Sequence, residues 1–179
     1  MPRVEIRFAG FGGQGIGLLG RLMGEAIALY MKEKNAIMTQ SYGPESRGGA
    51  SSSDVVIDEG EIAYPKATHY DYLVVMSEEA YHKYIPNLKE GGTLFVEENL
   101  VILDDHAKKA GKILKIPATK IAEEIGSSLY ANIAMLGFFC ANTDIVSEDA
   151  LKKVIREKVK ARFVKNNLIA FEKGKNYKG

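Results

Sequence analysis

The sequence predicts an α/β domain in which helices cover both faces of a mostly parallel sheet, a three-layer Rossmann-like arrangement. Three observations support this fold class. Short apolar runs alternate along the chain with segments whose apolar residues recur every three or four positions. The first run ends in a cluster of glycines that leads directly into a helical segment. A later run, residues 72–76, is apolar in the manner of a strand buried on both faces.

The N-terminal half is predicted to alternate strands with helices. Residues 4–9 should form a strand, and residues 16–33 an amphipathic helix with the 3.6-residue period. Residues 36–41 and 51–57 are expected to be two further strands, before the buried strand 72–76. Ser77 is expected to cap a helix over residues 78–84, where Glu78 and Glu79 in the first turn favour the helix dipole.

The C-terminal half is predicted to add two short strands, residues 93–96 and 112–116, followed by helices. One helix starts from Pro117 onward. Residues 129–141 are apolar almost all round, which indicates a helix buried in the domain or at an interface. Ser147 should cap a last helical stretch that keeps its period to Val159. We expect residues 174–179 to form a frayed tail.

Length and composition exclude several classes of protein. The 179 residues suit one domain with one sizeable core, and we expect a single domain over residues 1–179. A net charge of +1 gives no general electrostatic reason to expect a nucleic-acid partner. No apolar run approaches the roughly 20 residues of a membrane helix, and the N-terminus does not resemble a signal peptide. We therefore expect a cytoplasmic protein that contacts neither nucleic acid nor membrane.

The cysteine and histidine content argues against a metal centre on this chain. Cys140 is the only cysteine, so an internal disulfide and a cluster held by several thiolates of this chain are both excluded. Cys140 follows the apolar run 134–139, where we expect a buried, inert thiol. His69, His82 and His106 lack metal-ligand spacing.

The glycine loop that follows the first strand, residues 10–15, fits the spacing G-x-G-x-x-G. Glycines let a backbone approach a ligand closely, and the free amides at the start of the next helix favour an anion. A dinucleotide site also needs an acidic residue at the end of the second strand, where this chain has Thr39, Gln40 and Ser41. No Walker-type Lys-Ser or Lys-Thr pair follows the glycines. The loop therefore either contacts an anionic group or only permits tight packing of the strand on the helix.

A second loop, residues 42–49, reads Tyr-Gly-Pro-Glu-Ser-Arg-Gly-Gly and is too rich in glycine and proline for a regular element. In a parallel sheet this loop and the glycine loop both leave the carboxyl ends of strands, so we expect them to lie side by side. Arg47 offers a planar, permanent charge on a backbone that can fold closely around it. It is either a ligand-binding group or a surface arginine in a flexible turn.

Four segments resemble motifs of one enzyme family. Residues 10–16 look like its opening G-x-G-G-Q-G-[VI], and residues 41–49 like its S-Y-G-P-E-x-R-G-G stretch. Residues 132–137 resemble a later N-x-x-M-L-G segment, and residues 167–174 a closing N-x-x-A-F-x-x-G. The family is that of the gamma subunits of 2-oxoacid:ferredoxin oxidoreductases, and the second motif has the form associated with 2-oxoglutarate enzymes. The matches run in the family's order over nearly the whole chain.

The resemblance implies an enzyme of several subunits that oxidatively decarboxylates a 2-oxoacid. Such enzymes use thiamine diphosphate with Mg²⁺, coenzyme A as co-substrate, and iron–sulfur clusters that pass electrons to ferredoxin. With 2-oxoglutarate the product would be succinyl-CoA. This chain has one cysteine and lacks a Gly-Asp-Gly segment of the kind that holds thiamine diphosphate. The alpha and beta subunits, and in some enzymes a delta subunit, are therefore expected to carry the cofactor and the clusters.

From the two loops we predict a site that is completed at a subunit interface. Backbone amides of the glycine loop would face an anion, with the Gln14 side chain as a neutral donor and Arg47 as a bidentate charge. The anion would be a substrate carboxylate or a coenzyme A phosphate. The candidate binding residues are Gly12, Gly13, Gln14, Gly15, Tyr42, Glu45, Arg47, Gly48 and Asn132.

The roles of Glu45 and Asn132 stay open at this point. We interpret Glu45 as a partner for Arg47 or a solvated carboxylate rather than a general base, and we name no catalytic acid or base on this chain. Asn132 either caps the helix that it opens or reaches the interface. Two other functions compete with the subunit interpretation, namely a stand-alone nucleotide-binding or sensing module and a purely architectural subunit.

Overall fold

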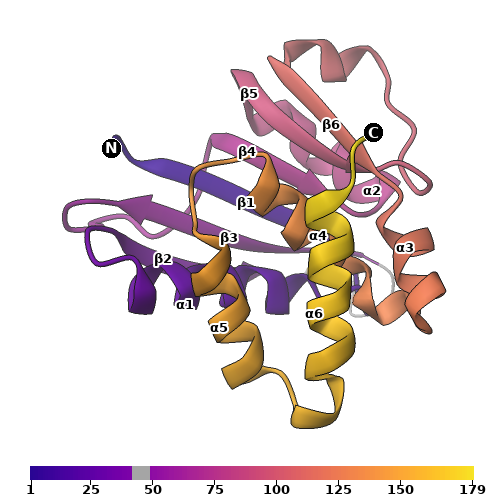
Figure 1. Cartoon of the computed structure of the whole chain (residues 1–179). Helices are drawn as coiled ribbons and strands as arrows, with labels where there is room; N and C mark the ends of the chain where they lie inside the picture. The colour runs from indigo at the N-terminus through magenta and orange to yellow at the C-terminus, as the bar shows by residue number, and fades with distance from the viewer. Residues whose placement is uncertain (42–48) are drawn as a thin grey trace.

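A six-stranded sheet in the order β2-β3-β1-β4-β5-β6 forms the centre of the molecule (Figure 1). The computed structural model describes residues 1–41 and 49–179. The strands are β1 (Val4–Phe11), β2 (Asn35–Ser41), β3 (Ala50–Asp58), β4 (Tyr70–Val75), β5 (Leu88–Glu97) and β6 (Lys112–Ile116). Each of the six predicted strands is present, and the predicted bounds of the last one match those of β6.

The sheet is mostly parallel, as predicted. The pairs β1–β4, β4–β5 and β5–β6 are parallel, whereas β3 runs antiparallel to both of its neighbours, β1 and β2. The reversal at β3 follows from the short connection between Ser41 and Ala50. A parallel crossover needs a dozen or more residues, so a connection of this length can only return the chain in the opposite direction.

The helices cover both faces of the sheet, which confirms the predicted three-layer arrangement. α2 packs on β1, β3 and β4 from one side, and α1 packs on β1, β2 and β3 from the other. α4 lies on the same side as α1, while α5 packs on α1 and α6 on α4 as an outer layer (Figure 1). The helices are α1 (Ile16–Tyr30), α2 (Glu78–Tyr84), α3 (Ala118–Ile125), α4 (Ala131–Ala141), α5 (Glu148–Lys158) and α6 (Ala161–Asn176), with short 3-10 turns η1 (Ile85–Asn87), η2 (Asp105–Lys109) and η3 (Ser128–Tyr130).

Two serines cap helices as the sequence predicts. Ser77 Oγ accepts a hydrogen bond from the Ala80 amide over 3.2 Å, and Ser147 Oγ accepts one from the Ala150 amide over 3.2 Å. These bonds satisfy amides that the first turn of a helix leaves free. α1 ends at Tyr30, three residues before the predicted end. In the described part of the chain no helix is long and apolar enough to cross a membrane.

The main core lies between the sheet and the α1–α4 layer. Phe8 of β1, Phe95 of β5 and Phe139 of α4 meet there, with ring centroids 5.9 Å apart for Phe8–Phe139 and 4.9 Å for Phe95–Phe139. Residues of α4 from Ala131 to Phe139 are buried. The prediction that this apolar segment is a buried helix is therefore confirmed, and it explains why its sequence shows no polar face.

On the α2 side of the sheet a buried ion pair joins β1 to β3. The Arg7 guanidinium donates two hydrogen bonds to the Asp54 carboxylate, each 2.6 Å long, and lies between the rings of Tyr70 and Tyr84. Arg7 and Asp54 are directly opposite in the β1–β3 register. Shifting this register by one residue would bury both charges without partners, so the pair helps to specify how the reversed strand aligns.

Two glycines allow α6 to lie against α4. A Cβ at Gly137 would collide with the Phe171 carbonyl, and one at Gly174 would collide with the Ala134 carbonyl. This contact extends α6 to Asn176, and the Tyr177 ring packs edge-on against Phe138 at 5.9 Å. The prediction of a frayed tail from residue 174 is therefore wrong for residues 174–177, because tertiary packing orders them.

Candidate functional site

The predicted loops are anchored at one edge of the sheet. β1 ends at Phe11, which pairs with Ala50 at the start of β3, and β2 ends at Ser41, which pairs with Ser52. The glycine loop and the segment after Ser41 therefore both leave the carboxyl edge, with β3 between their strands. Tyr42, Glu45, Arg47 and Gly48 lie outside the described residues, so their contacts stay a prediction.

The Gln14 side chain ties the glycine loop to the neighbouring strand. Gln14 Oε1 accepts a hydrogen bond from the Phe11 amide over 2.9 Å, and Gln14 Nε2 donates to the Met76 carbonyl over 2.8 Å. Met76 directly follows β4, and its amide donates to the Ala9 carbonyl. Gln14 is thus a brace between two strand ends. Since one of its side-chain N–H groups is used internally, only the other is available for the predicted contact with an anion.

Asn132, in the first turn of α4, also contacts the glycine loop. Its Nδ2 donates to the Gly15 carbonyl over 3.2 Å, and its Oδ1 accepts from the Ile133 amide over 2.8 Å. Gly15 has φ 71°, and a Cβ at this position would collide with the Asn132 amide. The structure thus brings together two residues that the sequence predicted for one site. Asn132 satisfies an amide of the first turn of α4, as a cap would, and also holds the loop.

The glycines of the loop differ in the reason for which the fold requires them. A Cβ at Gly10 would contact the Gln14 carboxamide, the Ile16 side chain and Met76, so this glycine permits tight packing of β1 on α1. Gly13 needs its φ of 96° for the turn. Gly12 has no positive φ, and among the described residues no atom lies within 4 Å of the position that a Cβ would take. The packing interpretation therefore accounts for Gly10, and it leaves the glycine at position 12 unexplained.

The first turn of α1 presents its amides without a side-chain cap. The N-cap residue is Gly15, which offers no side-chain hydrogen bond, and no acidic residue stands in the first turn. The first intrahelical bond runs from the Leu19 amide to the Gly15 carbonyl. The preceding amides and the positive end of the helix dipole therefore face the space over the glycine loop, an arrangement that favours an anion.

A buried carboxylate at the same end of the sheet was not among the residues predicted from the sequence. Glu97 ends β5, and it is fully buried. Its carboxylate accepts hydrogen bonds from the Thr119 amide (2.7 Å), the Thr119 hydroxyl (3.1 Å) and the Asn99 amide (3.0 Å). The carboxylate thus caps α3, whose own N-cap residue, Pro117, has no polar side chain. A lone glutamate closing an apolar strand was the signal available in the sequence.

The side chains of residues 1–41 and 49–179 do not form a site for a metal or an iron–sulfur cluster. Among the described residues, no group of three or more histidines, cysteines and acids is placed to hold a metal. Cys140 is half-buried, and burial, reinforced by the nearby Glu148 charge, raises the pKa of its thiol to about 11. A thiol with so high a pKa is a poor ligand and nucleophile near neutral pH. The chain therefore supplies no ligand set for a cluster.

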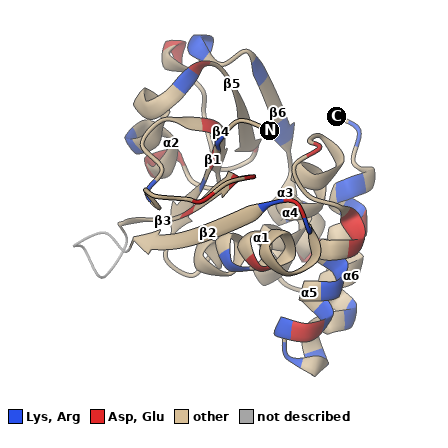
Figure 2. Cartoon of the chain, turned by 90° about the vertical axis from the view of Figure 1, so that its left-hand side faces the viewer, with Lys and Arg blue, Asp and Glu red and all other residues tan. Residues whose placement is uncertain are grey.

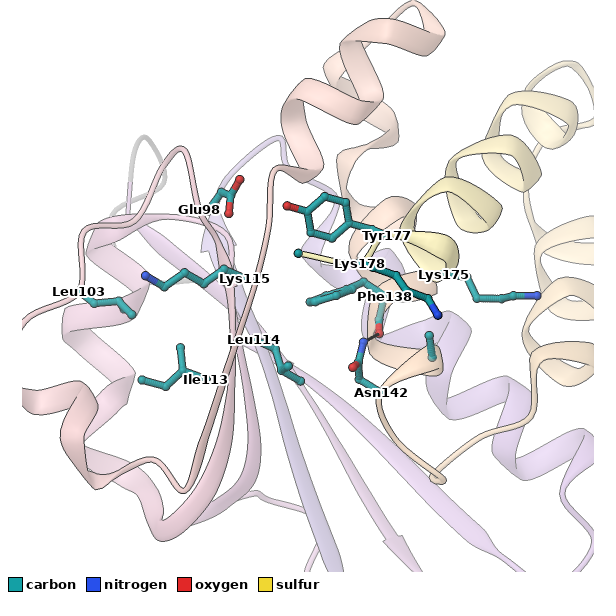
Figure 3. Close-up of a pocket in the computed structure, with 12 residues that line it drawn as sticks. Glu98, Leu103, Ile113, Leu114, Lys115, Phe138, Asn142, Lys175, Tyr177 and Lys178 are labelled. Atoms are coloured by element: carbon teal, nitrogen blue, oxygen red, sulfur yellow. Dashed lines mark hydrogen bonds between the residues drawn. The ribbon is translucent and has the colours of Figure 1, made fainter.

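A hollow of about 800 Å³ lies away from these loops, between the β6 edge and the C-terminal ends of α4 and α6. Figure 3 shows Leu114, Phe138, Asn142 and Tyr177 around it, with the Asn142 side chain bonded to the Phe138 carbonyl. Asn142 follows the end of α4, whereas Asn132 lies in its first turn. None of the described binding candidates lines this hollow, so it is separate from the glycine-loop site.

These features define an α/β protein with a glycine turn at the carboxyl ends of its parallel strands. The family model described as pyruvate ferredoxin/flavodoxin oxidoreductase matches residues 5–177. The chain therefore belongs to this oxidoreductase family.

Individual relatives agree with this assignment. The chain is 49% identical over 173 residues to the 2-oxoglutarate synthase subunit KorC of Methanocaldococcus jannaschii, covering 96% of this chain and 92% of the relative. It is 43% identical to the KorC subunit of Methanothermobacter thermautotrophicus, over 97% of this chain and 94% of that one. The gamma subunit of a keto/oxoacid ferredoxin oxidoreductase from Geobacter sulfurreducens has a TM-score of 0.86 at 39% identity, over 98% and 95% of the two chains.

In another relative the segment that matches this chain is part of a longer chain. The ketoisovalerate oxidoreductase subunit VorA of Methanothermobacter marburgensis is 31% identical over 155 residues, which cover 86% of this chain and 31% of VorA. In VorA the matching segment is therefore covalently joined to further sequence about twice its own length. Homology to oxidoreductase subunits favours the subunit interpretation over a stand-alone nucleotide-binding module.

Proposed function

We propose that this chain is the gamma-type subunit of a coenzyme A-dependent 2-oxoglutarate:ferredoxin oxidoreductase, and that its glycine loop contacts an anionic group at a subunit interface. The reaction releases carbon dioxide from 2-oxoglutarate, transfers the succinyl group to coenzyme A and passes electrons to ferredoxin. Partner subunits of the alpha, beta and possible delta types would hold thiamine diphosphate, Mg²⁺ and the iron–sulfur clusters. A cytoplasmic location and a single domain over residues 1–179 remain predictions.

The substrate part of the proposal rests on two lines of support. Relatives named 2-oxoglutarate synthase subunit match almost the full chain at 43–49% identity, whereas a common gamma subunit of pyruvate/ketoisovalerate oxidoreductases from Thermococcus litoralis matches at 29%. The loop of residues 41–49 also has the form associated with 2-oxoglutarate enzymes. Both favour 2-oxoglutarate over pyruvate and the branched-chain oxoacids.

The main support for the proposed anion contact is the glycine at position 12. Residues 1–41 and 49–179 contain no packing contact or backbone angle that requires a glycine there, yet the backbone on either side is braced by Gln14 and Asn132. A braced loop with open space over one glycine suits the close approach of a group from outside the chain. The uncapped first turn of α1 supplies amides for a carboxylate or phosphate. In this arrangement the Arg47 guanidinium would donate two hydrogen bonds to the same anion.

The chain's contribution to the reaction would be binding and orientation. Backbone amides and Arg47 hold an anionic group so that partner residues and cofactors can act on the rest of the molecule. No described side chain at the glycine loop is an acid or base. The residues flanking the loop therefore act as positioning residues.

The experiment uses the complex purified through a tag on a partner subunit. 2-Oxoglutarate should support coenzyme A-dependent reduction of ferredoxin or a viologen dye, with kcat/KM at least tenfold above that for pyruvate and 2-oxoisovalerate. The isolated chain should show no turnover. A purified complex that prefers pyruvate would disprove the substrate assignment.

Three variants of the complex test the loop. Gly12→Ala should raise KM for 2-oxoglutarate or coenzyme A while leaving the melting temperature of the isolated chain unchanged, because no atom of the described residues obstructs the added methyl. Arg47→Ala should lower kcat/KM by about 100-fold or more, as expected for loss of one partner of a desolvated ion pair. Gly60→Ala, on an exposed turn where a Cβ meets only Asp58 at 3.7 Å, is the matched control. Unchanged kinetics for both loop variants would leave an architectural role.

A further inference from the structure

The charge of the chain is unevenly distributed. Residues 151–179 contain ten lysines and arginines and two glutamates, a net charge of +8, whereas residues 1–150 carry −7. The overall charge of +1 therefore conceals a strongly basic C-terminal end. Most of that end is α5 and α6, the outer helices of the molecule, and Figure 2 shows basic segments along both. A field of one sign over one part of a surface indicates a partner of the opposite sign.

The outward side of α6 combines these charges with exposed apolar groups. Arg162, Lys165, Ile169 and Lys173 follow one another at spacings of three and four residues, so they lie on one side of the helix. All four are exposed, and Ile169 keeps 37% of its surface accessible. We call this side, with the adjoining Leu168, the α6 face. In Figure 1, α6 lies on the outside of the molecule.

The cations of the α6 face lack partners within the described part of the chain. The one acid beside them, Glu172, is turned toward α5, where it pairs with Lys152, and it lies 3.6 Å from Lys175. Arg162, Lys165 and Lys173 make no salt bridge with a described residue. These charges are therefore available to an external group.

A hollow lies in the middle of the face. It measures about 610 Å³ and is lined by Leu168, Ile169 and Tyr177 together with the polar residues Lys165, Glu172, Lys173 and Asn176. Its one acid, Glu172, is already paired with Lys152. An apolar centre with a charged rim is the usual construction of a protein–protein interface. A nucleic acid would meet the same lysines but would leave Leu168 and Ile169 without apolar contacts, so the face suits a protein better.

We propose that the α6 face docks an acidic, apolar-centred surface of a partner subunit of the same oxidoreductase. The proposal rests on the proposed function. VorA supports it, because there the matching segment occupies 31% of a longer chain, so its neighbours are held covalently. A separate subunit needs a non-covalent surface for the same purpose. A second copy of this chain is disfavoured, since a two-fold contact would set the basic face against itself.

The test is assembly of the complex with charge-reversed variants. The double variant Lys165→Glu/Lys173→Glu should reduce the amount of this chain retained by a tagged partner subunit at least tenfold at about 0.15 M salt. Ile169→Asp should reduce retention without changing the basic charges on α6. The matched control is Lys112→Glu/Lys120→Glu, which reverses two exposed lysines on β6 and α3. Circular dichroism and melting temperatures verify that all variants fold.

The outcomes separate this proposal from the proposed function. Retention of the α6 variants at the level of wild type, in a complex that oxidises 2-oxoglutarate, would overturn the docking proposal and leave the function standing. Loss of retention in a complex that lacks 2-oxoglutarate activity would support docking and reject the function. Tight binding of the isolated chain to a duplex DNA probe, lost in the α6 variants while assembly is normal, would assign the face to nucleic acid instead.

Discussion

The Asn132 side chain donates to the Gly15 carbonyl over 3.2 Å and so joins the start of α4 to the turn that begins α1. This bond connects two of the four segments by which the sequence resembles its family, residues 10–16 and 132–137. The third of these segments also contacts the fourth, because Gly137 of α4 and Gly174 of α6 lie in the same helix–helix contact. Three motifs that are distant in sequence therefore form one continuous set of contacts, running from the glycine loop to the C-terminal helix.

Removing the Asn132 amide should destabilise the protein. Asn132 is 3% exposed, so Asn132→Leu would leave the buried Ile133 amide without its side-chain acceptor. It would also remove the Asn132 donor from the Gly15 carbonyl, which keeps only the Leu19 amide. We expect a loss of about 1–3 kcal/mol in the free energy of unfolding. Urea unfolding followed by circular dichroism measures it. The control is Asn176→Ala at the exposed end of α6, which should change the free energy by less than about 0.5 kcal/mol. Equal stability of the two variants would show that the bond contributes nothing.

The close contact of α4 with α6 should not tolerate a larger residue. In Gly137→Ala the added methyl would meet the Phe171 carbonyl, a backbone atom that cannot move without shifting α6. We expect destabilisation of about 1–3 kcal/mol or more from overpacking, although alanine is the better helix former by about 1 kcal/mol. Differential scanning calorimetry of the isolated chain measures the change. An unchanged or raised melting temperature would mean that the two helices separate freely.

Local signals in the sequence predicted most of the elements. The glycine turn, the caps at Ser77 and Ser147 and the apolar segment of α4 depend on residues close together in the chain, where spacing and side-chain chemistry decide the conformation. The direction of β3 was not predicted, because an apolar strand looks the same in either direction. It becomes clear only when the length of the connection between Ser41 and Ala50 is considered.

The features that the sequence did not predict depend on contacts between residues far apart in the chain. Gln14 bonds to Met76, 62 positions away, and Asn132 bonds to Gly15, 117 positions away. The sequence predicted Gln14 and Asn132 as binding residues, yet it could not show that both brace the loop internally. Residues 174–177 are likewise ordered because they pack on α4, whereas a chain terminus is usually expected to fray. Arg47 lies outside the described residues, so its predicted contact awaits the kinetic test.

Glu97 should be essential for the position of α3. In Glu97→Gln one carboxylate oxygen becomes an NH₂ group, which would face either the Thr119 amide or the Asn99 amide, both of them donors. Two opposed donors in a buried site should cost about 1–3 kcal/mol of stability. Glu98→Gln, at an exposed neighbouring position, should be nearly neutral. Chemical denaturation of both variants decides the matter, and equal midpoints would rule out a capping role for Glu97.

The hydrogen bond between Tyr81 and Asp104 should make part of the stability sensitive to acid. The Tyr81 hydroxyl, 2.6 Å from the carboxylate, together with His106 lowers the pKa of Asp104 to about 2. A carboxyl with a pKa below its unfolded value of about 3.9 contributes stability that is fully present above that value and is lost as the pH falls toward 2. The stability advantage of the wild type over Asp104→Asn should therefore be constant above about pH 5 and shrink between about pH 4 and 2.

Urea midpoints measured at several pH values test this dependence on Asp104. Tyr81→Phe is the informative companion, since it removes the largest cause of the lowered pKa while keeping the ring in its buried place. In that background the advantage of Asp104 over asparagine should be smaller at pH 6, and its loss should begin at higher pH. A wild-type advantage that stays constant from pH 6 down to the acid limit of folding would mean that Asp104 titrates alike in the folded and unfolded chain.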